Sequence, residues 1–187
     1  MINLTSPPLH IKDETILLKR YAMSDVDDLY EAARESIDEV YPFLPWCHPD
    51  YTRSESREWI RASVKQWDRG AAYNLAIFDS TDLTFLGGCG LGLSGNDRLR
   101  ANLGYWIRTS ATGTGIATRA ARLLAEYGFK HLSLQRIEIL MATHNPASRK
   151  VAEKTGAIFE GVLRNRLEIH NLIYDTYSYS LIPADTK

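Results

Sequence analysis

The residues best placed to do chemistry form a glycine loop that follows a predicted strand. Tyr105-Trp106-Ile107-Arg108 has the character of a strand, and Thr112-Gly113-Thr114-Gly115-Ile116-Ala117-Thr118 comes soon after it and opens a predicted helix. The first N–H groups of a helix have no intrahelical partner, and they attract anions. Glycines let the backbone approach a phosphate closely. A pyrophosphate group would therefore fit above Gly113 to Thr118.

A tight strand-to-helix turn without a ligand explains the same glycines equally well. The loop is not a dinucleotide-binding fingerprint, because the Gly-x-Gly-x-x-Gly spacing is missing and Thr118 occupies the position that glycine would need. It is not a Walker loop either, because no Gly-Lys-Ser/Thr follows it. The glycine loop alone therefore does not decide whether a ligand binds or which one.

A second group of candidates stands about 30 residues later, in the segment from Asn145 to Ala157. Asn145 follows a predicted strand, Pro146 suits the first position of a helix, and Ser148 lies on the first helical turn. An amide at Asn145 can bond a pantetheine-type amide, and the Ser148 hydroxyl can reach a thiol. The alternative is that Asn145 only caps the helix and Ser148 faces solvent.

These candidates need a scaffold, and the chain predicts a mixed α/β (α+β) fold of one domain over residues 10–182. Predicted helices begin near Ser24, at Thr52 (with Glu55 completing a capping box), near Thr114 and at Asn145. Because strands and helices follow each other in mixed order, the sheet should be mainly antiparallel, with about seven strands and about four flanking helices. The predicted strands are 15–21, 73–78, 85–93, 101–107, 136–142, 158–164 and 174–181.

Composition excludes several classes of protein. The 187 residues carry a formal net charge of -1, so the strongly basic footprint of a nucleic-acid-binding protein is missing. No stretch approaches the length of about 20 apolar residues that a membrane helix needs. Two cysteines are too few for a disulfide scaffold and fit a reducing compartment. We therefore expect a cytoplasmic protein that binds neither membranes nor nucleic acids.

Taken together, the two groups of candidates resemble the GNAT acetyltransferase superfamily. Leu103-Gly104-Tyr105-Trp106-Ile107 with the glycine loop is similar to that family's acetyl-CoA strand and pyrophosphate loop, and Asn145 to Ala157 is similar to its second CoA-contacting helix. Within the superfamily the chain looks closest to the ribosomal-protein N-acetyltransferases that modify N-terminal serine or alanine. Leu44-Pro45-Trp46 and Glu160-Gly161 support this resemblance.

The resemblance implies a sheet that splays in the middle, with acetyl-CoA between two central strands. The backbone of Ile107 would bond the pantetheine arm, and Asn145 and Ser148 would contact the cofactor. The pyrophosphate would be held by the backbone N–H groups of Gly113, Gly115, Ile116, Ala117 and Thr118. Ser148 would protonate the leaving thiolate, as its counterpart does in the relatives. Glu168, in the turn expected between residues 164 and 174, would be the general base. A homodimer is a further implication of the family.

Other side chains compete for these roles. His144 and His170 are alternative candidates for accepting a proton. Cys89 between Gly88 and Gly90 permits a covalent acetyl-cysteine, although Gly-Cys-Gly in a strand also suits a bulge near a ligand. Cys47 has no partner at metal-binding spacing, so no metal is expected.

The predicted function is transfer of the acetyl group of acetyl-CoA to a primary amine by direct attack in a ternary complex. The preferred acceptor is the N-terminal amine of a protein such as a ribosomal protein. One alternative is a small-molecule amine, such as an antibiotic, a polyamine or an amino acid, and another is a non-catalytic acyl-CoA-binding module. The segment from Glu35 to Tyr51, read as a broken helix or an ordered loop, is either a wall of the acceptor pocket or a hydrophobic plug.

Overall fold

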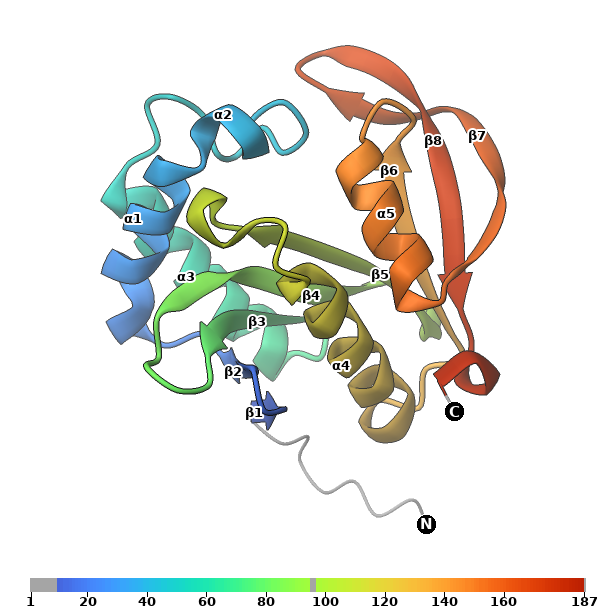
Figure 1. Cartoon of the computed structure of the whole chain (residues 1–187), viewed down its shortest axis with the longest axis horizontal. Helices are drawn as coiled ribbons and strands as arrows, with labels where there is room; N and C mark the ends of the chain where they lie inside the picture. The colour runs from blue at the N-terminus through green and yellow to red at the C-terminus, as the bar shows by residue number, and fades with distance from the viewer. Residues whose placement is uncertain (1–9, 95–96, 187) are drawn as a thin grey trace.

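The computed structural model describes residues 10–94 and 97–186, which form one eight-stranded mixed sheet with helices around it (Figure 1). The strands are β1 His10–Lys12, β2 Ile16–Arg20, β3 Ala72–Asp79, β4 Phe85–Ser94, β5 Asp97–Ile107, β6 Arg136–Ala142, β7 Ile158–Ile169 and β8 Leu172–Leu181. The α-helices are α1 Val26–Glu35, α2 Ile37–Val40, α3 Arg53–Asp68, α4 Ile116–His131 and α5 Pro146–Thr155. Short 3-10 turns lie at η1 Met23–Asp25, η2 Thr109–Ala111 and η3 Pro183–Thr186.

The sheet splays between β5 and β6, as predicted. Its strand order is β1-β2-β3-β4-β5-β6-β8-β7, and every neighbouring pair is antiparallel except β5 and β6. These two parallel strands pair only at residues 100–102 of β5 and 136–138 of β6. Beyond Asn102 they part, so the end of β5 has a β-partner on one side only.

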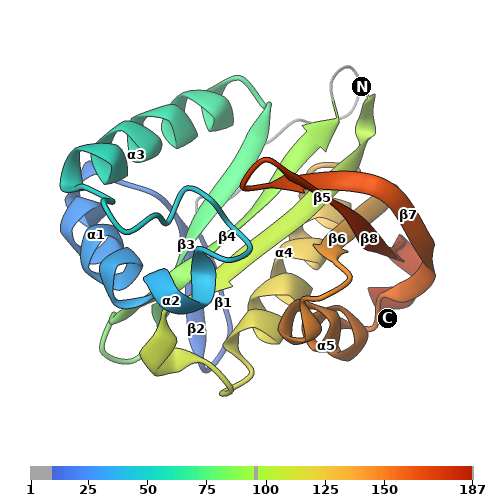
Figure 2. The same cartoon turned by 90° about the horizontal axis from the view of Figure 1, so that it is seen from above.

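Helices cover both faces of the sheet: α1 and α3 lie on one face, and α4 and α5 on the other (Figure 2). Because successive side chains of a strand point to opposite faces, neighbouring residues of β5 belong to different cores. Tyr105 packs with the α4 side, where Leu91, Leu103 and Leu124 are buried. Trp106 packs with the α1 and α3 side.

The segment after α1 contains a one-turn helix, α2, which agrees with the broken helix considered for residues 35–51. Two details of the fold differ from the sequence predictions. An eighth strand, β1, covers only three residues, which is too short for a periodic pattern. The turn expected between residues 164 and 174 is instead a two-residue turn at His170 and Asn171, whose φ angles of 53° and 61° suit a tight hairpin. Glu168 consequently lies in β7, opposite Ile173 of β8.

The capping residue predicted for α3 is confirmed, and the one predicted for α1 is wrong. The Thr52 hydroxyl accepts the Glu55 N–H at 3.3 Å, and Glu55 Oε2 accepts the Thr52 N–H at 2.8 Å, which completes the predicted capping box. Ser24 does not cap α1, because it lies inside the turn η1. The carboxylate of the buried Asp25 instead accepts the Ala22 N–H at 2.8 Å.

Candidate functional site

A cavity of about 1040 Å³ opens where β5 and β6 part. Its walls come from β4, β5 and β6, from the starts of α4 and α5, from the end of β7 and from residues 39–46. Ligand pockets commonly measure 300–1,000 Å³, so this cavity has room for more than one small substrate. It is lined by all the residues predicted for the site: Ile107, Gly113, Gly115, Ile116, Ala117, Thr118, Asn145, Ser148 and Glu168.

The glycine loop presents free backbone N–H groups to this cavity. Gly113 and Gly115 have φ angles of 77° and 86°, a conformation that residues with side chains rarely adopt. Gly115 is the N-cap of α4, and its carbonyl accepts the Arg119 N–H at 3.1 Å. Over the described chain, no N–H group of residues 113–118 donates to another backbone group. The arrangement can therefore bind an anion such as a pyrophosphate.

The part of β5 that borders the splay also offers unused backbone groups. Arg108 donates its N–H to the Leu86 carbonyl of β4 at 2.9 Å. Because backbone groups alternate in direction along an antiparallel strand, those of Tyr105 and Ile107 point away from β4. They point toward β6, which pairs with β5 only as far as Asn102.

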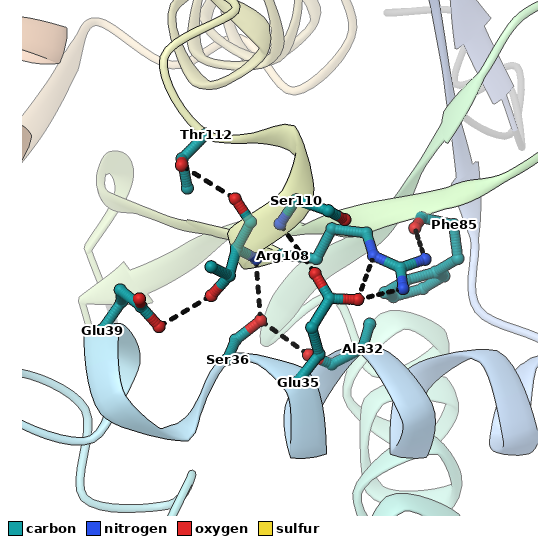
Figure 3. Close-up of polar contacts among 9 residues, drawn as sticks. Ala32, Glu35, Ser36, Glu39, Phe85, Arg108, Ser110 and Thr112 are labelled. Carbon is teal, nitrogen blue, oxygen red and sulfur yellow. Dashed lines mark hydrogen bonds and ion pairs between the residues drawn. The ribbon is translucent and has the colours of Figure 1, made fainter.

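A cluster of polar contacts, the Glu35–Arg108 clamp (Glu35, Arg108 and Ser110), fixes the approach to the glycine loop (Figure 3). The Glu35 carboxylate accepts the Ser110 N–H at 2.7 Å, Arg108 Nε–H at 3.0 Å and a second guanidinium N–H of Arg108. Arg108 also donates to the Phe85 carbonyl at 3.1 Å. The hydrogen bond from Arg108 is the main reason that the pKa of Glu35 is lowered to about 2.

A second set of contacts ties η2 to α1 and α2. The Ser36 hydroxyl accepts the Thr109 N–H at 3.0 Å and donates to the Ala32 carbonyl at 2.7 Å, and the Thr109 hydroxyl donates to Glu39 at 2.7 Å. The sequence analysis missed the clamp and these contacts. Their partners lie 70 to 75 residues apart, so no local motif marks them.

Ser148 meets a second hydroxyl that the sequence analysis did not single out. Tyr105 Oη lies 3.0 Å from Ser148 Oγ, and it donates to the Ser148 carbonyl at 3.1 Å. Burial raises the pKa of Tyr105 to about 12, so its hydroxyl keeps its proton at neutral pH. Two adjacent hydroxyls at the splay can pass a proton to a leaving group in the cavity.

Asn145 caps α5. Its Oδ1 accepts the Ser148 N–H at 2.9 Å, which is the capping alternative considered for this residue. The cap uses only the oxygen of the side chain, and Asn145 also lines the cavity. Its Nδ2 group therefore remains as a donor for a ligand.

The tip of the β7–β8 hairpin extends toward the segment after α2 (Figures 1 and 2), and residues of both segments line the cavity. His170 Nε2 lies 2.8 Å from the Tyr41 carbonyl, and the two rings are 4.3 Å apart. Glu168, two residues before this contact, is exposed and lines the cavity. His144 lies between the rings of Phe43 and Tyr174, at 5.6 and 4.6 Å. Both histidines thus have packing roles.

Neither a cysteine nucleophile nor a metal-binding cluster is supported at the site in the residues that the structure describes. Cys89 is buried, and burial raises the pKa of its thiol far above the usual range, which disfavours the thiolate that an acetyl-cysteine mechanism would need. In residues 10–94 and 97–186, no cluster of His, Cys, Asp or Glu could hold a metal ion. The same residues include no helix long and apolar enough to cross a bilayer.

Comparison with known proteins identifies the family. Residues 15–158, more than half of the chain, match the model of the acetyltransferase (GNAT) domain. The chain belongs to this family. It is therefore a GNAT acetyltransferase, and both the fold and the enzyme class predicted from the sequence are confirmed.

Three relatives illustrate the breadth of the GNAT match. YdaF of Bacillus subtilis (strain 168) is 40% identical over 86 residues, which cover 46% of this chain and 47% of that protein. The ribosomal-protein-serine acetyltransferase of Escherichia coli (strain K12) is 28% identical over 169 residues, covering 87% and 89%. A crystal structure of the microcin C7 self-immunity acetyltransferase MccE with acetyl-CoA and AMP superposes with a TM-score of 0.85 at 26% identity, covering 97% and 99% of the two chains.

Proposed function

We propose that this GNAT acetyltransferase, acting as one domain over residues 10–182, moves the acetyl group of acetyl-CoA to the N-terminal amine of a protein such as a ribosomal protein. The observation that carries the proposal is the single cavity that joins the free N–H groups of residues 113–118 to the Tyr105–Ser148 pair. One end of the cavity can hold a pyrophosphate, and the other can assist the departure of a thiolate. Acetyl-CoA has a pyrophosphate and a thioester that releases a thiolate, and MccE was crystallised with acetyl-CoA.

Acetyl-CoA, the acetyl donor, is bound mainly by backbone groups of the glycine loop and of β5. The N–H groups of Gly113, Gly115, Ile116, Ala117 and Thr118 hold the pyrophosphate. The pantetheine arm then extends along the open side of β5, where the backbone of Ile107 and the Asn145 amide can bond its amide groups. This path brings the thioester to the splay, next to Ser148.

The chemical step needs an oxyanion site and two proton transfers. The amine attacks the thioester carbonyl, and the N–H of Tyr105 stabilises the oxyanion. When the C–S bond breaks, Ser148 donates its proton to the sulfur and regains one from the attacking nitrogen, which must lose a second proton to become an amide; the neighbouring Tyr105 hydroxyl supports that transfer. Glu168 accepts the ammonium proton through water. Glu138 also lines the cavity, but its carboxylate is held in an ion pair with Arg136 at 3.0 Å.

The acceptor is argued from the shape of the site and from the relatives. Beyond the splay the cavity continues over β4, along residues 88–92, which gives an extended chain room to lie. Of the two relatives described above that were matched by sequence, the ribosomal-protein-serine acetyltransferase of E. coli covers the larger share of this chain, 87% against 46% for YdaF. Both observations favour a peptide terminus over a compact molecule.

A small-molecule amine is the second candidate. The His170–Tyr41 contact joins two segments whose neighbouring residues line the cavity, and such an enclosure would suit a compact acceptor. MccE, which confers immunity to microcin C7, matches nearly the whole chain. A non-catalytic acyl-CoA-binding role fits less well, because it gives no reason for two hydroxyls paired at the splay.

Mass spectrometry of acceptors incubated with labelled acetyl-CoA tests the proposal. Peptides that begin with serine or alanine should gain one acetyl group at the terminal amine, and a panel of polyamines, aminoglycosides and amino acids should react far more slowly. Acetylation of only the small molecules would refute the protein acceptor. Failure of acetyl-CoA to raise the melting temperature would refute donor binding itself.

A further inference from the structure

One cationic side chain of the cavity wall has no counterion. Arg166 of β7 lines the cavity and is exposed. Its guanidinium forms no hydrogen bond or ion pair with any other residue that the structure describes. Glu168, two positions later in the same strand, also lines the cavity, and the two side chains are not paired. The guanidinium is therefore available to a bound molecule.

A bulge in β7 determines where Arg166 lies. The register between β7 and β8 shifts here, so residues 164–166 lie opposite a single residue of β8, Asp175. Asn165 has a φ angle of 52° and donates its N–H to Asp175 Oδ1 at 2.9 Å. Bulges redirect side chains and are common beside active sites. The Asp175 hydrogen bond thus holds the backbone from which the Arg166 side chain reaches the cavity.

The bulge is linked to the strand end at which the sheet splays. The Asp175 carbonyl accepts the N–H of Thr143 at 3.1 Å, and Thr143 directly follows β6. Neighbouring strands lie about 4.8 Å apart, so β7 runs about 10 Å from β6, with β8 between them. A long side chain that enters the cavity from the bulge can therefore contact an acceptor whose amine lies at the splay.

The acidic residues of the cavity wall do not neutralise Arg166. Glu138 is paired with Arg136 at 3.0 Å, and Glu39 accepts the hydroxyl of Thr109 at 2.7 Å. Both carboxylates thus have partners of their own within the protein. The anion that Arg166 binds must then come from a ligand.

The phosphates of acetyl-CoA do not supply this anion. They are accounted for on the other side of the site, where Lys150 and Lys154 of α5 also line the cavity. The Lys154 carbonyl accepts a guanidinium N–H of Arg122 from α4, the helix that the glycine loop opens. The β7–β8 hairpin tip lies apart from the start of α4 in both views (Figures 1 and 2). Arg166 therefore serves the acceptor.

An acceptor that fills the cavity displaces water from the guanidinium. Removing a charge from water is unfavourable unless the charge meets an opposite one. A carboxylate of the acceptor would compensate for this loss, because it can accept two parallel hydrogen bonds from a guanidinium. A cationic acceptor would instead bring like charges together. The charge of Arg166 consequently favours an acidic acceptor and disfavours polyamines and aminoglycosides.

We propose that Arg166 is a specificity-determining residue that binds an acidic side chain close to the N-terminus of the acceptor protein. The first residue of the acceptor supplies the amine, and the acidic residue follows it within the next few positions. The proposal rests on the proposed N-terminal acetyltransferase function and adds the class of protein termini that the site prefers.

The test uses peptides that begin with the same residue and carry glutamate, glutamine or lysine at the second, third or fourth position. Mixtures of the three peptides give the ratios of kcat/KM directly by mass spectrometry. At one of these positions the wild-type enzyme should prefer glutamate to glutamine about fivefold, the upper range for a partly exposed ion pair, and lysine should be slowest. The preference should shrink as the salt concentration rises.

Variants of Arg166 should change this preference in a graded way. In Arg166→Gln the glutamate-to-glutamine ratio should fall to about one, whereas Arg166→Lys should keep part of the preference. Arg166→Glu should reverse the order, so that the lysine peptide reacts fastest. The Arg166 side chain has no partner among the described residues, so none of these changes should lower the melting temperature.

Arg164 provides the matched control. It is an exposed arginine of the same bulge that does not line the cavity, so Arg164→Gln makes the same change of charge and should keep the glutamate preference. Equal rates for the three peptides in the wild type would overturn the role of Arg166 and leave N-terminal acetylation intact. The same conclusion would follow if Arg166→Gln kept the preference, or if Arg164→Gln lost it equally. If no peptide reacted while small amines did, the proposed function itself would fail.

Discussion

Replacing Glu35 with glutamine removes the charge of the Glu35–Arg108 clamp and keeps its shape. The pKa of about 2, against an ordinary value of 4.5, means that the folded protein favours the ionised carboxylate. At about 1.4 kcal/mol per pKa unit, the full shift corresponds to about 3 kcal/mol. The side chain is 30% exposed, so solvent screens part of this interaction. We expect Glu35→Gln to lower the free energy of unfolding by about 1–2 kcal/mol at pH 7.

The same variant should weaken donor binding, because the clamp holds the segment that leads into the glycine loop. Ordering one backbone residue costs about 1–2 kcal/mol, so losing one anchor should raise the KM for acetyl-CoA about fivefold, with a smaller effect on kcat. Urea unfolding and steady-state kinetics measure the two effects. Glu126→Gln, which breaks an exposed ion pair with Lys130 on α4, is the matched control and should change neither by much.

The pH dependence of stability gives a third readout of the clamp. The folded pKa of Glu35 lies below its ordinary value, so the ionised group contributes its full stability above about pH 4.5 and loses it as the pH falls toward 2. The difference in unfolding free energy between wild type and Glu35→Gln should therefore shrink over that range. Equal stability and equal KM at pH 7 would show that the clamp does not position the loop.

Three further predictions concern the site itself. Gly115→Ala places a side chain at a φ of 86°, so it should cost about 1 kcal/mol of stability and weaken acetyl-CoA binding measured by calorimetry; unchanged affinity would argue against the glycine loop as the pyrophosphate site. Ser148→Ala and Tyr105→Phe should each lower kcat while the dissociation constant for CoA stays the same, and normal turnover in both would remove these hydroxyls from the mechanism. Glu168→Gln should lower kcat about 100-fold at neutral pH, with partial recovery at higher pH as the free amine becomes more abundant. A rate equal to the wild type at every pH would exclude Glu168 as the base.

The glycine loop and the start of α5 could be predicted because the residues that mark them are close together in the sequence. The glycines at 113 and 115 follow a strand and open a helix within a few residues, and Pro146 with Ser148 marks the next helix start. Helix ends and positive φ angles depend on neighbouring residues, so a short stretch of sequence contains the information. The structure places these segments around one cavity.

The contacts between distant segments could not be predicted in this way. The Glu35–Arg108 pair spans 73 residues, and no spacing rule links a helix end to a strand end at that distance. The partnership of Tyr105 with Ser148 also depends on how β5 and α5 meet in space. The length of the β7–β8 hairpin was missed because β7 is exposed along most of its length and lacks a buried periodic face.

The alternation of β5 has a consequence for how this enzyme can change. Tyr105 faces the α4 side, where its hydroxyl meets Ser148, and Trp106 faces the α1 and α3 side, so one strand contributes to two separate walls of the cavity. Substitutions of cavity-lining residues around Trp106 can therefore change the cavity on that side while the Tyr105–Ser148 pair and the N–H groups of residues 113–118 stay in place. The two sides of the cavity can thus vary independently of each other.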